Sequence, residues 1–330
     1  RCDQPANFSA SQLTCNMSQA LNNTGRDMWL NFHCWHDADC AKCGNSFRVF
    51  HDHHDDWGST SSTIDFLANN RQPFWGPDPD YGWPDADFIY TGGEGCGSHS
   101  PPGQRCPGQS EVEYVSEFSI WAIAQGQLVL ATDPRNMTAF MKKVLFNKEV
   151  LDVFRDVSGF RDVVMIPSNT TPPAPGPVPA VCSVALKKQI SRAACTAHAS
   201  FDCVNGSQNM WTDDGCRGEF TCNGLPTTCD VDNAGRHTCD CGGSDDQVQS
   251  WLRPTADGGG AAVLHNPTDS AADVSVTFAD VPKRGWSEQT SIHVRDLWVH
   301  KDLGSMTNKF VAKGVPSHGS VFVKLAQLHA

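Results

Sequence analysis

The stretch Asn45–Trp57 concentrates the residue types that do acid–base chemistry. It reads N-S-F-R-V-F-H-D-H-H-D-D-W, with one arginine, three aspartates and three histidines in thirteen residues. The carboxyl group of Asp52 can act as a general acid, because neighbouring Asp55 and Asp56 can raise its pKa by like-charge repulsion. The same composition is equally typical of a solvated acidic loop with no chemical role.

A metal site is a third interpretation of this stretch. Its histidines are His51, His53 and His54. Imidazole and carboxylate groups together can bind zinc, but two of these histidines are adjacent, which is a poor spacing for ligands of one ion. We therefore predict no metal and no cofactor.

The elements around this stretch predict α/β architecture for the first half of the chain. Over Arg1–Phe160, helical patterns alternate with short apolar runs, which is typical of β-then-α units. Strands are expected at Met28–Cys34, Ser46–Phe50, Phe88–Tyr90 and Leu128–Ala131, and helices at Ser9–Asn23, Ser62–Asn70, Glu111–Ala124 and Thr138–Phe146. Asp52 thus follows a strand, and enzymes built as β/α barrels carry catalytic groups at the carboxyl ends of their strands.

Three further segments follow the α/β part, which we assign to residues 1–166. Residues 167–180 are a proline-rich linker, and residues 181–245 carry eight cysteines with few apolar residues, so disulfides must replace much of a core. The part Trp211–Phe220 resembles a small cysteine-rich module of unknown function found in secreted proteins. Residues 246–330 show short alternating strands between turn signals, which predicts an antiparallel β-sandwich.

Length and charge exclude several classes of partner. The chain has 330 residues, of which 39% are hydrophobic and 19% charged, enough for two or three domains. Its net charge of -12 repels nucleic acid and anionic lipid, so we expect neither as a partner. The sequence has no apolar run of about 18 residues, and we expect no membrane span.

Cysteines and glycosylation motifs indicate a secretory route. The chain has 15 cysteines, too many for a reducing compartment, and the odd count leaves one thiol without a partner in the chain. Motifs for N-glycosylation begin at Asn7, Asn16, Asn22, Asn136, Asn169 and Asn205. We expect a secreted protein, or one of a lysosome-like or vacuole-like compartment.

Several stretches, in order, resemble the α-galactosidase-like glycoside hydrolases of family 27. The similar stretches are Ala20–Arg26, Asn45–Trp57, G-W-P-D-A-D-F at Gly82–Phe88, Glu113–Trp121, Phe146–Val153, Val294–Gly304 and Val315–Gly319. The family has a (β/α)8 barrel followed by an antiparallel β-domain. The resemblance therefore implies an α/β plus all-β chain: the second half of a barrel (strands five to eight), a disulfide-rich insertion, and a C-terminal β-sandwich.

The resemblance also implies a retaining mechanism that uses two carboxyl groups about 5–5.5 Å apart. Asp52 would be the acid/base, and Arg48 would hold sugar hydroxyls or the nucleophile. The family's nucleophile is the aspartate of a D-x-C motif, which falls one residue before Arg1 when its cysteine is aligned with Cys2. We therefore expect the missing N-terminal half of the barrel as a partner, and an isolated chain that is unstable or self-associates and is inactive.

Other residues receive weaker assignments from the resemblance. Asp85 and Asp87 either support the sugar site from behind or cap a turn, and Trp35, Trp75 and Trp83 either stack on sugars or pack in the protein. In the family the cysteine aligned with Cys2 pairs with one upstream, which leaves six cysteines for the barrel part. We expect the disulfides Cys34–Cys43 and Cys96–Cys106, with Cys15 and Cys40 left over to pair.

The substrate implied is a terminal α-D-galactosyl residue, so the expected partner is an α-galactoside-type carbohydrate. The family often reads C-E-W-G after strand five, where this chain reads C-W-H-D at Cys34–Asp37. Galactose, N-acetylgalactosamine and arabinopyranose therefore all stay open. The alternative function is a non-catalytic carbohydrate-binding or adhesion protein on the same scaffold.

Overall fold

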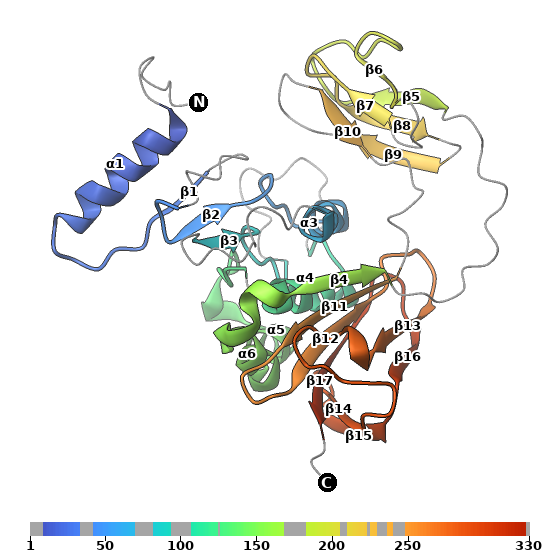
Figure 1. Ribbon diagram of the computed structural model, residues 1–330. Coiled ribbons are helices and arrows are strands. Elements are labelled where there is room, and N and C mark those ends of the chain that lie inside the picture. Colours follow the sequence, from blue (N-terminus) through green and yellow to red (C-terminus); the bar gives the residue numbers. More distant parts are fainter. Residues whose placement is uncertain are drawn as a thin grey trace. The chain divides into compact units, whose positions relative to one another are not determined.

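The computed structural model forms two compact units, Arg1–Ser168 with Val248–Ala330, and Asn169–Gln247. Figure 1 shows its ribbon. The structure describes residues 9–33, 42–69, 82–93, 107–124, 126–167, 183–204, 210–222, 225–229, 236–239 and 248–327. Within these ranges no helix is both long and apolar enough to cross a bilayer.

Three parallel strands form the sheet that carries the Asn45–Trp57 stretch. The order is β1 (Asn31–His33), β2 (Ser46–Arg48) and β3 (Trp83–Asp85). The register places His33 opposite Arg48, and Arg48 opposite Asp85. The expected strand at Phe88–Tyr90 is reduced to a single parallel bridge, Ile89 to Leu130, because Asp87 turns the chain with a left-handed φ of 78°.

The helices of this unit precede β1 or follow β2 and β3 in sequence. They are α1 (Ala10–Asn22), α3 (Trp57–Asn69), α4 (Glu111–Ala124), α5 (Ala139–Leu145) and α6 (Lys148–Arg155). Helix α3 begins at Trp57, five residues before its expected start, because the carboxylate of Asp56 accepts from the amide of Ser59 at 2.7 Å and caps it. Helix α4 has its expected bounds, and the Ser110 amide bonds the Glu113 carboxylate at 2.7 Å at its start.

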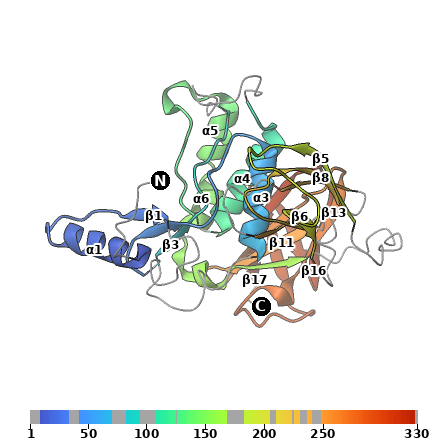
Figure 2. The same ribbon diagram turned by 90° about the horizontal axis from the view of Figure 1, so that it is seen from above.

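Helix α4 is the shared wall of the first unit. Nearly every residue from Tyr114 to Ala124 is buried, so the helix packs on more than one side. One core cluster joins α3, α4, α5 and α6 to strands of the C-terminal sheet. Figure 2 shows α3 and α4 next to each other, with β11 beside them.

The C-terminal part is the predicted antiparallel sandwich. Its larger sheet has the order β15-β14-β17-β12-β11-β4, and β13 pairs with β16 opposite it. The strands are β4 (Val164–Pro167), β11 (Gln249–Pro254), β12 (Gly260–His265), β13 (Ala272–Thr277), β14 (Ile292–Asp296), β15 (Lys301–Met306), β16 (Lys309–Val315) and β17 (Ser320–Gln327). A second apolar cluster, including Phe278 and Ile292, lies among these strands.

Polar contacts attach the sandwich to the helices of the same unit. The indole of Trp298 donates to Ser119 on α4 at 3.0 Å, and Arg295 holds Glu149 on α6 with two bonds of 2.8 Å. Asn147 caps α6 through its side-chain oxygen and donates from its nitrogen to the carbonyl of Leu297 at 2.8 Å.

The second unit consists of short antiparallel strands joined by disulfides. One sheet has the order β5-β8-β9 and the other β10-β7-β6. The strands are β5 (Val184–Gln189), β6 (Phe201–Cys203), β7 (Met210–Thr212), β8 (Gly218–Cys222), β9 (Leu225–Cys229) and β10 (His237–Cys239). Disulfides Cys195–Cys216 and Cys229–Cys239 contribute sulfur to a small core around Phe201 and Phe220.

The disulfide predicted between Cys34 and Cys43 is wrong. Cys43 is bonded to Cys15 of α1, which also excludes the pairing of Cys15 with Cys40. The Cα atoms of Cys15 and Cys43 lie 4.8 Å apart, within the range that a disulfide requires, and each thiol forms one such bond. The predicted Cys96–Cys106 bond lies outside the described residues.

We predict that Asn147→Ala lowers the free energy of unfolding by about 2–4 kcal/mol, because it removes a helix cap and leaves the Leu297 carbonyl without this donor. Asn147→Asp keeps the cap and loses the donor, so it should cost less. Urea unfolding measures both. The exposed Asn23→Ala is the control and should change stability by less than about 0.5 kcal/mol; an equally small effect of Asn147→Ala would contradict this account.

Candidate active site

Arg48 stands at the carboxyl end of β2 and binds the residues around it. One guanidinium nitrogen lies 2.7 Å from the Asp87 carboxylate and 3.3 Å from that of Asp52. The same nitrogen donates to the carbonyl of His51 at 2.7 Å. Asp87 is buried and the Arg48 side chain is 11% exposed, whereas the Asp52 side chain is 76% exposed. A largely buried cation thus pairs with a buried carboxylate and also reaches a water-accessible one.

The segment after β2 alternates between solvent and interior. His53 and Asp55 are buried, while Asp52 and His54 between and beside them are exposed. This is the pattern of an extended chain, in which successive side chains point to opposite sides. The buried residues therefore anchor the segment, and Asp52 projects outward from it.

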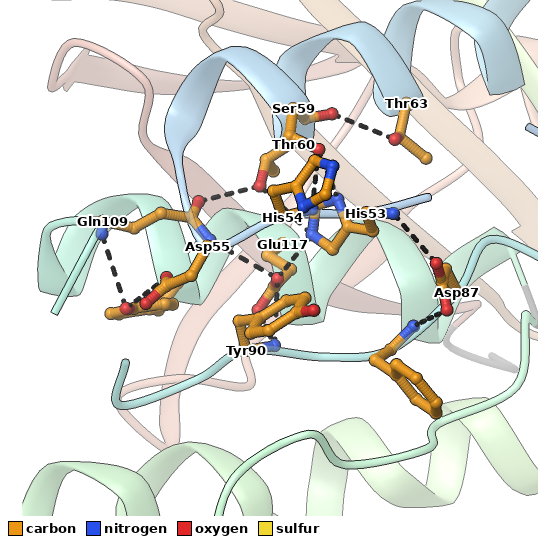
Figure 3. A network of polar contacts seen from close by, with 12 residues as sticks. His53, His54, Asp55, Ser59, Thr60, Thr63, Asp87, Tyr90, Gln109 and Glu117 are labelled. Atoms are coloured by element: carbon orange, nitrogen blue, oxygen red, sulfur yellow. Dashed lines mark hydrogen bonds and ion pairs between the residues drawn. The ribbon is translucent and has the colours of Figure 1, made fainter. Parts of the chain in front are cut away.

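His53 is the first anchor, and Figure 3 shows its surroundings. Its Nε2 lies 2.9 Å from Oε1 of Glu117 on α4, and its Nδ1 lies 3.1 Å from the hydroxyl of Ser59 on α3. Both side chains of the His53–Glu117 pair are 0% exposed. The backbone amide of His53 donates to the Asp87 carboxylate at 2.9 Å, so this residue joins α4 to the Arg48 cluster.

Asp55 is the second anchor. Its carboxylate accepts from the Tyr114 hydroxyl at 2.6 Å and from the Gly108 amide at 3.0 Å. Burial raises the pKa of Asp55, although these hydrogen bonds oppose the shift. Burial and the contact with Asp55 also raise the pKa of Tyr114. Asp55 is thus bonded to Tyr114 of α4, and Asp56 caps α3.

Asp85 and Asp87 tie the sheet to this segment. The Asp85 carboxylate accepts from the Asp87 amide at 2.8 Å and from the Asn31 side chain at 2.5 Å, which links β3 to β1. Burial and the neighbouring Asp87 raise the pKa of Tyr90, so its phenol stays protonated beside these carboxylates. Asp87 contacts Arg48 directly, and Asp85 acts through Asp87.

The other residues proposed from the sequence are less close to Arg48 or fall outside the described residues. Trp83 is half-buried and packs against the core cluster of α4. Trp35, Trp75, Cys34, Cys96 and Cys106 lie in segments that the structure does not describe. Asn16, Asn22 and Asn136 are exposed, and the remaining glycosylation motifs, at Asn7, Asn169 and Asn205, are outside the described ranges.

The described residues contain no group of three or more histidine, cysteine or carboxylate side chains placed to hold a metal ion. The histidines of the stretch diverge: the His53 ring is buried against Glu117, and the His51 ring packs on Phe50 with centroids 4.6 Å apart. What the arrangement offers is a carboxyl group open to water beside a fixed cation.

Two residues of this region were missed by the sequence analysis. Glu117 was hidden in the apolar pattern of its helix, although a charged residue at a core position is itself a signal. His33 lies in register with Arg48 at the end of β1, and only the pairing of parallel strands could have revealed it.

Comparisons with known proteins agree with this fold. The sequence model of a family described as alpha galactosidase A matches residues 2–156, and that of the alpha galactosidase C-terminal beta sandwich domain matches residues 245–325. A family of unknown function matches residues 150–261, which include the cysteine-rich unit.

Relatives of similar sequence carry the same description. An alpha-galactosidase of Cyamopsis tetragonoloba is 29% identical over 306 residues, which cover 92% of this chain and 51% of that protein. An alpha-galactosidase of Oryza sativa subsp. japonica is 29% identical over 228 residues, covering 64% of this chain and 50% of its own. The chain thus spans about half the length of these relatives.

A solved structure shows the shared fold. The α-galactosidase of Saccharomyces cerevisiae, determined with raffinose, superposes with a TM-score of 0.60 at 15% identity, covering 99% of this chain and 71% of the other. Fold and sequence models together define a chain of the glycoside hydrolase class. Within that class, it belongs to the α-galactosidase-like proteins of glycoside hydrolase family 27.

We predict that Asp55 makes stability depend on pH. Because its folded pKa lies above its ordinary value of about 3.8, the folded state binds more protons than the unfolded state between the two values. Stability should therefore fall as pH rises through this window, by at most about 1.4 kcal/mol per pH unit. The difference between wild type and Asp55→Asn, measured by urea unfolding from pH 4 upward, isolates this contribution.

Tyr114→Phe is the matched variant for this titration. It removes a hydrogen bond that lowers the pKa of Asp55, so the window should extend to higher pH. A wild-type stability that rises with pH relative to Asp55→Asn would show that the sign assigned to this group is wrong.

Proposed function

We propose that this chain supplies the acid/base half of a retaining glycosidase site that cleaves terminal α-D-galactosyl residues. The observation that carries the proposal is that Arg48, at the carboxyl end of a parallel strand, contacts the carboxylates of both Asp87 and Asp52. In β/α enzymes this edge holds the catalytic groups. The family assignment supplies the reaction class, and an α-galactoside-type carbohydrate is the partner.

Asp52 protonates the glycosidic oxygen in the first step and activates water in the second. Its exposure suits both steps, since the group must reach the substrate and then exchange a proton with water. Arg48 orients this carboxyl group. Among the described residues its buried Nε has no acceptor.

The nucleophile, in this proposal, lies outside the 330 residues. The chain spans about half the length of the matched relatives, and the family's D-x-C motif aligns its cysteine with Cys2. The chain then corresponds to barrel strands five to eight, and the other strands come from the rest of the protein. With one carboxyl group of two, the isolated chain does not hydrolyse glycosides.

The decisive experiment compares Asp52→Asn with Asp56→Asn in the full-length protein. Loss of the acid should lower kcat on an alkyl α-galactoside such as raffinose by about 10²–10⁴-fold. Asp56→Asn is matched, because asparagine also caps a helix, and it should change kcat by less than about twofold.

The leaving group makes this test specific for an acid. The dinitrophenolate of a dinitrophenyl α-galactoside leaves without protonation. Asp52→Asn should therefore lose much less activity in the first step on this substrate than on raffinose. A decrease of kcat by less than about tenfold on raffinose would refute the acid role of Asp52. Hydrolysis of an aryl α-galactoside by the isolated 330-residue chain, as a soluble monomer, would refute its dependence on an external nucleophile.

We also propose that the protein follows the secretory route. The disulfides Cys15–Cys43, Cys195–Cys216 and Cys229–Cys239 need an oxidising compartment, and Asn16, Asn22 and Asn136 present exposed glycosylation motifs. Expression in a eukaryotic secretory host should give glycoprotein that loses mass on treatment with peptide N-glycosidase. Changing each of these asparagines to glutamine in turn should remove one glycan; an unmodified secreted protein would contradict the proposal.

A further inference from the structure

The buried His53–Glu117 pair has no part in the two-carboxylate reaction, yet it lies directly behind it. The Glu117 carboxylate accepts from the Tyr90 amide at 3.2 Å and from the side chain of Gln109 at 3.4 Å, in addition to His53. Such a set of donors suits an ionised carboxylate. Burying the Glu117 carboxylate without these partners would be unfavourable, and the donors around it offset that cost.

The ring of His53 is satisfied at both nitrogens. Nε2 lies 2.9 Å from the Glu117 carboxylate, and Nδ1 lies 3.1 Å from the hydroxyl of Ser59, whose oxygen accepts from the His54 amide at 2.9 Å. The ring is therefore oriented from two helices, by Glu117 on α4 and Ser59 on α3.

The fixed ring determines where Asp52 lies. His53 directly follows Asp52, and its amide bonds the same Asp87 oxygen, Oδ2, that Arg48 contacts. Arg48 in turn holds the carbonyl of His51 and the carboxylate of Asp52. The guanidinium of Arg48 thus holds the Asp52 carboxylate, and the buried ring of His53 fixes the residue that follows Asp52.

We propose that His53 and Glu117 are positioning residues, which hold the Asp52 segment against Asp87 so that the acid meets the glycosidic oxygen. The proposal rests on the function proposed for Asp52. Charged residues around the pair are Asp55 and Asp87, and the polar groups of Tyr90, Thr60 and Gln109 complete its surroundings (Figure 3).

The test separates positioning from stability with a double variant. His53→Leu or Glu117→Leu alone leaves a buried polar partner unpaired, so each should destabilise the protein. His53→Leu/Glu117→Leu removes both partners and should restore most of the stability. His54→Leu, one residue away and exposed, is the matched control and should leave kcat within about twofold.

In the full-length protein, the double variant should keep KM within about threefold and lose at least about tenfold in kcat on raffinose, because misplacement of a catalytic group by about 1 Å can cost about 10²-fold. A structural role alone predicts that kcat returns with stability. Recovery of kcat to within about twofold of wild type in a stable double variant would overturn the proposal.

Hydrogen exchange gives a readout that does not depend on activity. In the full-length protein, the peptide that contains residue 53 should exchange at least about tenfold faster in the double variant than in the His54→Leu control, because its amide no longer stays on Asp87. Unchanged exchange would overturn the positioning role, whatever the kinetics show. A different outcome is that Asp52→Asn leaves kcat unchanged while the double variant exchanges faster. That outcome would show that the proposed function has failed and the positioning of the segment has not.

Discussion

The carboxylate of Asp87 is the contact on which the rest of the site depends. It accepts from the guanidinium of Arg48, from the amide of His53 and from the amide of Phe88. Its own backbone is left-handed, with a φ of 78°, and its carbonyl accepts from the indole of Trp121 at 3.0 Å. A left-handed residue other than glycine is unfavourable by about 1–2 kcal/mol, and the surrounding bonds offset this cost. Without Asp87, the largely buried Arg48 would keep only the exposed carboxylate of Asp52 as an ion-pair partner among the described residues.

Helix α4 explains why the sandwich matters to the site. One side of the helix presents Trp121 and Glu117 to the loop that carries Asp52, and another presents Ser116 and Ser119 to the sandwich. Ser116 bonds the carbonyl of His318, whose ring stacks on Trp57 with centroids 4.4 Å apart. Trp57 begins α3, directly after the anchored segment. The sandwich therefore supports both helices that orient His53.

The sequence predicted the elements better than their contacts. Alternation and turn residues were sufficient for β12, β13, β14 and β17, because these strands bury one face or both, whereas the exposed β15 lacks that signal. The strand expected at Phe88–Tyr90 is only one bridge, and β3 before it was not predicted, since nothing in G-W-P-D-A-D-F reveals that Asp87 adopts a left-handed turn. Cys43 was assigned to the wrong partner because a disulfide depends on distance in space, and α1 is far from Cys43 in sequence. Arg48 and Asp52 were proposed from their motif, but Glu117 joins them only through a contact across 64 residues.

The charge density of Asn45–Trp57 now divides into two physical classes. His53 and Asp55 are buried, and each is held by partners from other elements, as a low-dielectric interior requires. Asp52 and His54 remain in water, where charge costs little. The alternation of an extended chain makes this division possible, because each anchored residue fixes the exposed residue beside it. The acid role proposed for Asp52 requires a fixed position and access to water, and a segment fixed at every second residue gives Asp52 both.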